Sequence, residues 1–177
     1  MRHAAVALLL VAAACGAPPR VTQAPLAPDA AITVLPFAPP ASVTDYPISA
    51  TALGGDFATR VVEELRRRGR AAELADEAVA GASTVSGQLL RVDGGSHAKR
   101  FWIGLGAGRA SVSAEGTVTR PDGTTLATFR ERRSSSGEAE LGFAGDEYLV
   151  AKCMRALAED VADMVVSGSY RQIDLDE

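Results

Sequence analysis

Residues 111–133 read SVSAEGTVTRPDGTTLATFRERR, and this stretch predicts a β-hairpin. In its first nine positions small or apolar residues alternate with polar ones, the period of a strand with one buried and one wet face. A turn follows, because Pro121 presets φ and Gly123 can adopt a positive φ. Residues 125–133 then return as the second strand. The hairpin is expected to form part of a half-buried sheet.

A β-α-β unit is expected ahead of the hairpin. Residues 32–37 begin with β-branched side chains and are stopped by prolines, which predicts the first strand. From Leu53 to Leu65 apolar side chains recur at four-residue spacing, so an amphipathic helix is expected there, ending at Gly69. Residues 71–74 then predict a short strand parallel to the first.

The remaining segments predict one helical turn, one strand and the longest helix. The single turn is expected at residues 76–80 and the strand at residues 84–92. Asp146 begins the long helix, which should end near Gly168. Cys153 falls in the apolar stripe of this helix and is expected to be buried.

Together these elements predict an α+β fold built as a two-layer sandwich. Two helices with one apolar stripe each, and about five strands with one apolar face, are buried most simply when both helices pack on one face of a mixed sheet. Residues 31–168 have the length of a single domain. Residues 169–177 are expected to be a frayed acidic tail.

The N-terminal segment has the composition of a secretory signal. Residues 1–14 combine a basic start, an uncharged apolar run of 11 residues and small residues at a cleavage site. A transmembrane helix would need about 20. Because the small residues lead directly into Cys15, the segment resembles the lipobox of a bacterial lipoprotein, in which this cysteine carries fatty acyl chains such as palmitate. The alternative is an ordinary signal peptide cut after Ala14. Residues 15–30 are rich in proline and predict a semi-rigid tether.

Residues 99–109, KRFWIGLGAGR, form the most distinctive internal segment. The dinucleotide fingerprint needs a third glycine where this chain has Arg109 and a helix afterwards, whereas a strand is expected here. A glycine-rich turn is the simplest interpretation. The alternative is a partner-binding loop, because aromatic and arginine side chains are typical of interface anchors. That loop would comprise Arg100, Trp102, Gly104, Gly106, Gly108 and Arg109.

Composition argues against several classes of function. The chain has 18 basic and 22 acidic residues, so its net charge is −4 and nucleic acid is not an expected partner. The basic run at residues 66–70 is expected to complement a helix C-terminus. His97 is the only histidine outside the signal, so neither a metal site nor a Ser-His-Asp site is expected. No enzyme activity and no cofactor are therefore predicted.

The lipobox, the proline-rich spacer and the order of elements resemble a bacterial lipoprotein family, domain of unknown function 4410. The likeness spans residues 32–166 and depends most on Arg100 and the glycines at 104, 106 and 108. The resemblance implies no catalytic residues. Similarity in layout to the curli secretion lipoprotein and to activators of peptidoglycan synthases implies binding and scaffolding.

These observations predict a lipid-anchored cell-envelope protein that serves as an interaction or scaffolding module for an unidentified envelope protein. In such lipoproteins an Asp after the lipidated Cys is associated with the inner membrane. Gly16 stands there, so the resemblance implies the outer membrane, facing the periplasm. The alternatives are an auxiliary subunit or small-ligand binder of an envelope transport or secretion system, and a periplasmic hydrolase with an unrecognised site. The sequence does not indicate the oligomeric state.

Overall fold

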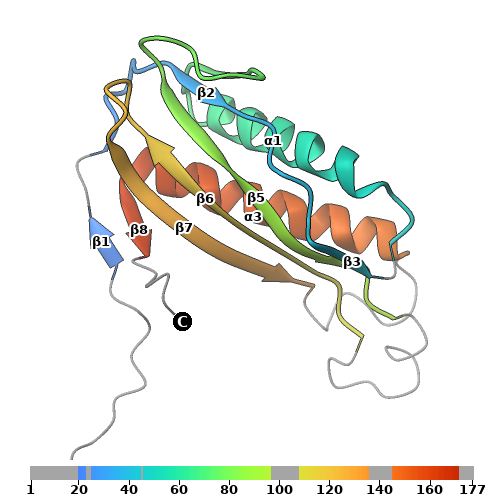
Figure 1. Ribbon diagram of the computed structural model, residues 1–177. Coiled ribbons are helices and arrows are strands. Elements are labelled where there is room, and N and C mark those ends of the chain that lie inside the picture. Colours follow the sequence, from blue (N-terminus) through green and yellow to red (C-terminus); the bar gives the residue numbers. More distant parts are fainter. Residues whose placement is uncertain (1–19, 23–24, 45, 97–107, 136–144, 172–177) are drawn as a thin grey trace, which may run out of the picture.

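The computed structural model describes residues 20–22, 25–44, 46–96, 108–135 and 145–171. Two long helices pack against one face of a twisted mixed sheet (Figure 1), which confirms the predicted two-layer α+β fold. The helices are α1 (Ala50–Arg67) and α3 (Asp146–Ser167). The strands are β1 (Arg20–Thr22), β2 (Ile32–Val34), β3 (Ser42–Thr44), β4 (Ala72–Leu74), β5 (Ser83–Asp93), β6 (Ser111–Thr119), β7 (Thr125–Ser134) and β8 (Ser169–Arg171).

Six strands form the main sheet, in the order β4-β2-β5-β6-β7, with β3 paired to the far end of β5. β2 runs parallel to both β4 and β5, so β2, α1 and β4 form the expected β-α-β unit. β5, β6 and β7 are antiparallel neighbours, and the predicted hairpin is β6–β7. Gly123 takes a φ of 84° in its turn, as the turn chemistry requires.

Four short segments differ from the sequence predictions. Residues 42–44 form β3, a strand that no sequence pattern predicted, and residues 76–80 do not form the expected helical turn. β1 lies within the expected tether and β8 within the expected tail, yet the two pair antiparallel, Val21 opposite Tyr170. The pairing joins residues far apart in sequence, which local patterns do not reveal.

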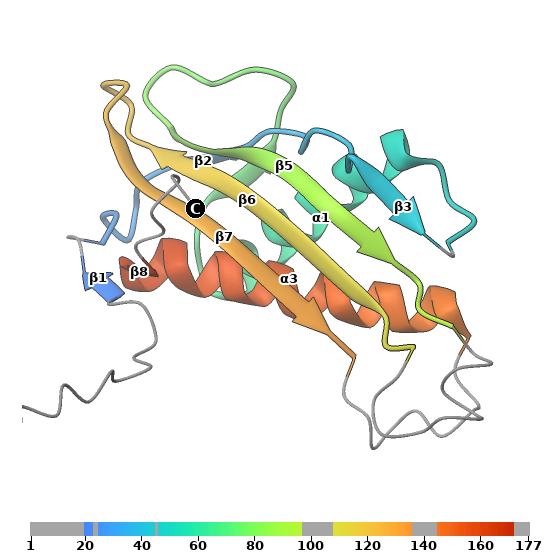
Figure 2. The ribbon, with the colours of Figure 1, turned by 60° about the horizontal axis from the view of Figure 1, so that its bottom comes forward.

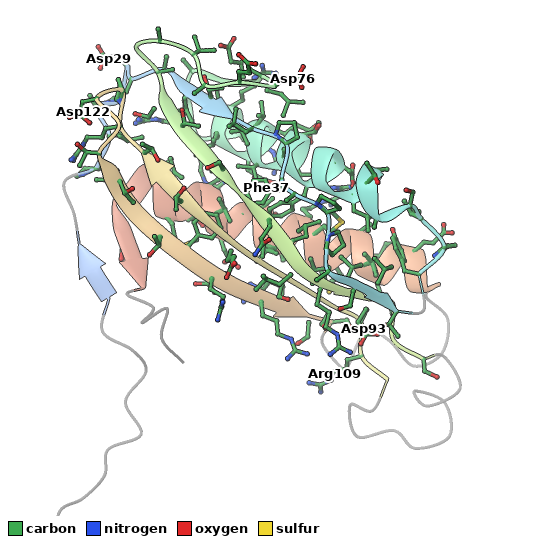
Figure 3. The ribbon with its side chains drawn as sticks, viewed as in Figure 1. Asp29, Phe37, Asp76, Asp93, Arg109 and Asp122 are labelled. Carbon is green, nitrogen blue, oxygen red and sulfur yellow. The ribbon has the colours of Figure 1, made fainter. Side chains whose placement is uncertain are left out.

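The core lies between the sheet and the helices and contains a group of three phenylalanines. Phe37 sits between the sheet and α1 (Figure 3) and meets Phe57 edge-on, with ring centroids 4.8 Å apart. Phe129 of β7 lies 6.5 Å from Phe37. The Phe37–Phe129 pair is tilted, whereas an edge-to-face pair such as Phe37–Phe57 stabilises a core beyond simple burial.

Glycines allow this core to close. A Cβ on Gly54 would lie 1.9 Å from the carbonyl oxygen of Phe37, so only glycine lets α1 approach that backbone. Gly87 and Gly116 are paired across β5 and β6, and a Cβ on either would lie within 3 Å of the ring of Phe37 or of Phe129. The aromatic rings therefore occupy the space that side chains at these two strand positions would fill.

The two helices run in the same direction, and their C-terminal halves are linked by Arg68. Its Nε donates to Asp163 Oδ1 at 2.7 Å, and its Nη1 donates to Glu64 Oε2 at 2.8 Å. Arg68 is the C-cap residue of α1, so the basic run at residues 66–70 lies at a helix C-terminus, as the sequence predicted. Arg70 is buried and donates to the carbonyl oxygen of Ala27 at 2.6 Å, which ties the N-terminal segment to the domain. Neither described helix is long and apolar enough to span a bilayer.

Candidate functional site

The first candidate surface is the uncovered face of the main sheet. Figure 2 shows β5, β6 and β7 in front of both helices. Inward-facing positions of these strands are mostly buried, whereas outward-facing ones such as Gln88, Glu115 and Arg130 are half-buried or exposed. Within the described ranges, no helix or strand lies over this face. The described helices and strands therefore leave this face uncovered.

A three-residue polar network, which we call the Glu115 network, crosses this face from β5 to β7. Gln88 Nε2 donates to Glu115 Oε1 at 2.5 Å. Arg130 Nε and Nη2 donate to Glu115 Oε2 at 2.9 and 2.7 Å. These hydrogen bonds, Arg130 first and Gln88 second, hold the pKa of Glu115 below its ordinary value. Glu115 is therefore an ionised, oriented acceptor at neutral pH.

A shallow depression of about 350 Å³ lies beside this network. Its rim includes Ser86 and Thr117, whose hydroxyl oxygens are 3.2 Å apart. Its floor runs over the paired glycines Gly87 and Gly116. The face thus offers fixed hydrogen-bonding groups around a small hollow, an arrangement suited to contact with a polar protein surface.

The structure describes only the end of the predicted partner-binding loop. Gly108 has a φ of 73°, and its carbonyl oxygen accepts from Ser96 N–H at 3.1 Å, so this position is a turn that favours glycine. Arg109 is exposed and lies near Asp93 at one end of the sheet (Figure 3). Arg100, Trp102, Gly104 and Gly106 lie outside the described residues, so their role remains a prediction.

Two predicted features lie at opposite ends of the chain. Cys153 is a buried cysteine of α3, as the apolar stripe predicted, and its Sγ lies 3.7 Å from the carbonyl oxygen of Ala110. Cys15, the predicted lipidation site, lies outside the described residues. Among the described side chains, no three His, Cys, Asp or Glu residues come together as a metal site would require.

Sequence reasoning placed Glu115 on the wet face of its strand but did not find the Glu115 network. The alternation of apolar and polar residues in β6 indicates the face on which Glu115 lies. The partners of Glu115 come from β5 and β7 and follow from strand register, in which Glu115 stands opposite both Gln88 and Arg130. Only the observed pairing brings the three side chains together.

Solved structures with the same fold come from several bacteria. A single-residue variant of the PelC dodecamer from Paraburkholderia phytofirmans is 15% identical, with a TM-score of 0.51 over 86% of this chain and 98% of that one. The PelC dodecamer itself is 13% identical, with a TM-score of 0.53 over 80% and 94%. Protein XCC0632 from Xanthomonas campestris is 13% identical, with a TM-score of 0.52 over 84% and 91%. At these identities the likeness concerns the fold alone.

Sequence comparison identifies the family. No curated protein matches the chain significantly. The family model described as a domain of unknown function, DUF4410, matches residues 44–138, which is more than half of the chain and runs from the end of β3 past the β6–β7 hairpin. The family predicted from the sequence is thereby confirmed: this chain belongs to the DUF4410 family.

Proposed function

We propose that this protein is a lipid-anchored module of the bacterial cell envelope that binds a protein partner through the uncovered face of its sheet. The observation that carries the proposal is the Glu115 network beside its depression, on a face that no described element covers. Such a face presents the oriented carboxylate of Glu115 and the guanidinium of Arg130 among accessible strand residues. In this proposal the protein has no catalytic role and needs no cofactor.

The anchor part of the proposal depends on Cys15 and on the residues before it. Several acyl chains on one cysteine would hold the domain at a membrane, since each buried methylene adds about 0.8 kcal/mol. Gly16 after the cysteine favours the outer membrane, facing the periplasm. Labelling cells with palmitate tests this directly: the full chain should take up label and fractionate with membranes, whereas Cys15→Ala should do neither. An unlabelled wild-type chain that washes out with soluble proteins would overturn the anchor.

The binding part is tested by reversing one charge in the Glu115 network. Arg130→Glu places a second carboxylate beside Glu115, so cross-linked capture of partners from membranes should fall by more than about fivefold, the loss expected for an interface residue that contributes more than about 1 kcal/mol. Arg155→Glu makes the same charge change on an exposed position of α3 and is the matched control. Recovery of the same partners, in the same amounts, by both variants and by the wild type would contradict this assignment.

A second candidate function is a subunit of an oligomeric envelope transport or secretion assembly. It is favoured by one observation, the similarity of fold to the PelC dodecamer. Light scattering of the full chain carrying Cys15→Ala distinguishes the two candidates. A stable ring-sized oligomer would support the assembly subunit, and a monomer at micromolar concentration would exclude self-assembly of the domain alone.

A further inference from the structure

A groove lies between the N-terminal ends of α1 and α3, in the helix layer and away from the uncovered sheet face. Its volume is about 440 Å³, within the range of roughly 300–1,000 Å³ that small-molecule sites occupy. The apolar walls include Ile48, which is 43% exposed, together with Ala52 and Ala151, and the buried Leu53 and Met154 also contribute to the lining. The groove therefore has the size and apolar walls of a ligand site.

Four polar side chains also line this groove: Tyr46, Asp56, Arg60 and Glu147. Asp56 Oδ2 accepts from Arg60 Nε at 3.1 Å, so the opposite charges of these two side chains offset each other. Glu147 is exposed in the first turn of α3. The lining side chains thus carry two negative charges against one positive charge.

The pKa of the Tyr46 phenol indicates which of these charges dominates inside the groove. Burial raises the pKa of its phenol above 10, the charges of Glu147 and then of Asp56 raise it further, and the weaker influence of Arg60 lowers it. The carboxylates therefore outweigh the guanidinium at the phenol. Negative charge beside apolar walls is complementary to a positive group on an apolar body.

From these positions of apolar and acidic side chains we propose that the groove binds a small organic cation, an aliphatic amine whose chain packs on Ile48, Ala52 and Ala151 while its ammonium group faces Glu147 and Asp56. A simple anion of the same shape is disfavoured by the same carboxylates. The site is independent of the proposed protein-binding face, because it involves other elements and the opposite side of the sheet.

The test uses the full chain with Cys15→Ala and three matched probes, n-hexylammonium, hexan-1-ol and n-hexanoate, titrated by NMR. The ammonium should bind about two- to fivefold more tightly than the alcohol, the effect of an exposed ion pair, and the carboxylate more weakly than both. Ala151→Leu partly fills the groove and should weaken all three probes.

Variants then establish where the preference arises. Glu147→Gln and Asp56→Asn should each reduce the preference for the ammonium, and Asp56→Asn should do so more, because it also releases the charge of Arg60. Glu73→Gln, an exposed carboxylate on β4, should leave the preference unchanged. Glu147 also complements the N-terminus of α3, so each variant is first checked for unchanged circular dichroism. Equal binding of ammonium and alcohol, a preference that survives both variants, or no binding of any probe would overturn the proposal.

Discussion

The two sides of the sheet are built from alternate residues of the same strands, yet they differ in almost every physical respect. On the helix side Val85, Leu89 and Phe129 are buried in one apolar core. On the open side Gln88, Glu115 and Arg130 form a hydrogen-bonded network in contact with water. Successive side chains of a strand point to opposite faces of the sheet, so one strand can supply apolar residues to the core and polar residues to the open side. Mutations can therefore separate stability from the binding proposed for the open side.

The largest expected effect comes from removing a ring on the helix side. Phe57 is fully buried and contacts Phe37 edge-on, so Phe57→Ala leaves a cavity and should lower the free energy of unfolding by about 3–5 kcal/mol. Thr128→Ala, on the open side of β7, should change it by less than about 0.5 kcal/mol. Urea denaturation measures both. Similar losses for the two variants would contradict the contrast between the two sides.

A second, smaller effect compares two adjacent glycines of α1. Gly54→Ala places a methyl group against the carbonyl of Phe37 and should cost about 1–3 kcal/mol in unfolding free energy. At Gly55 a Cβ meets nothing within 4 Å, so Gly55→Ala should stabilise the protein by up to about 1 kcal/mol through helix propensity. Thermal melting of the two variants should move in opposite directions. A gain for both would show that α1 can shift away from the sheet without penalty.

The smallest effect lies in the pH dependence of the open side. In the folded protein the pKa of Glu115 is below its ordinary value of 4.5. Between the folded pKa and pH 4.5 the folded state therefore binds fewer protons than the unfolded chain. Its stabilising contribution is present above pH 4.5 and is lost as pH falls through the folded pKa. For an exposed pair the loss should be about 0.2–1 kcal/mol.

Glu115→Gln provides the control for this pH effect, because glutamine cannot titrate. The difference in unfolding free energy between the wild type and Glu115→Gln should be largest near neutral pH and should shrink on acidification, as followed by urea denaturation from pH 7 to pH 3. A difference that stays constant over that range would remove the assigned role of the carboxylate.

Sequence patterns predicted the long elements and the short strands β2 and β4, but they missed the short strands β1, β3 and β8. The β6–β7 hairpin, α1 and α3 each carry several repeats of their period, so the signal accumulates along the element. β3 has only three residues, Ser42–Thr44, and is a strand because β5 offers it a partner. The expected turn at residues 76–80 failed for the same reason, since one turn of helix has little stability of its own.

Of the candidate functional residues, those defined by local chemistry could be proposed from the chain alone. Cys15 has its context in the preceding small residues, and Gly108 has a turn conformation that glycine favours. The Glu115 network and the groove at Tyr46 and Glu147 could not be proposed in this way, because each joins residues from separate elements. The spacing of these residues along the sequence does not indicate that they lie close together in space.

The sequence by itself determined the alternation of the strands, the apolar stripes of both helices and hence an α+β sandwich, because burying an apolar face is a local demand that each element carries in its own pattern. The tertiary structure decided strand register, the β1–β8 pair and the direction in which α1 lies along α3. These depend on contacts between distant residues, whose free energy appears only when the chain has closed the loops between them.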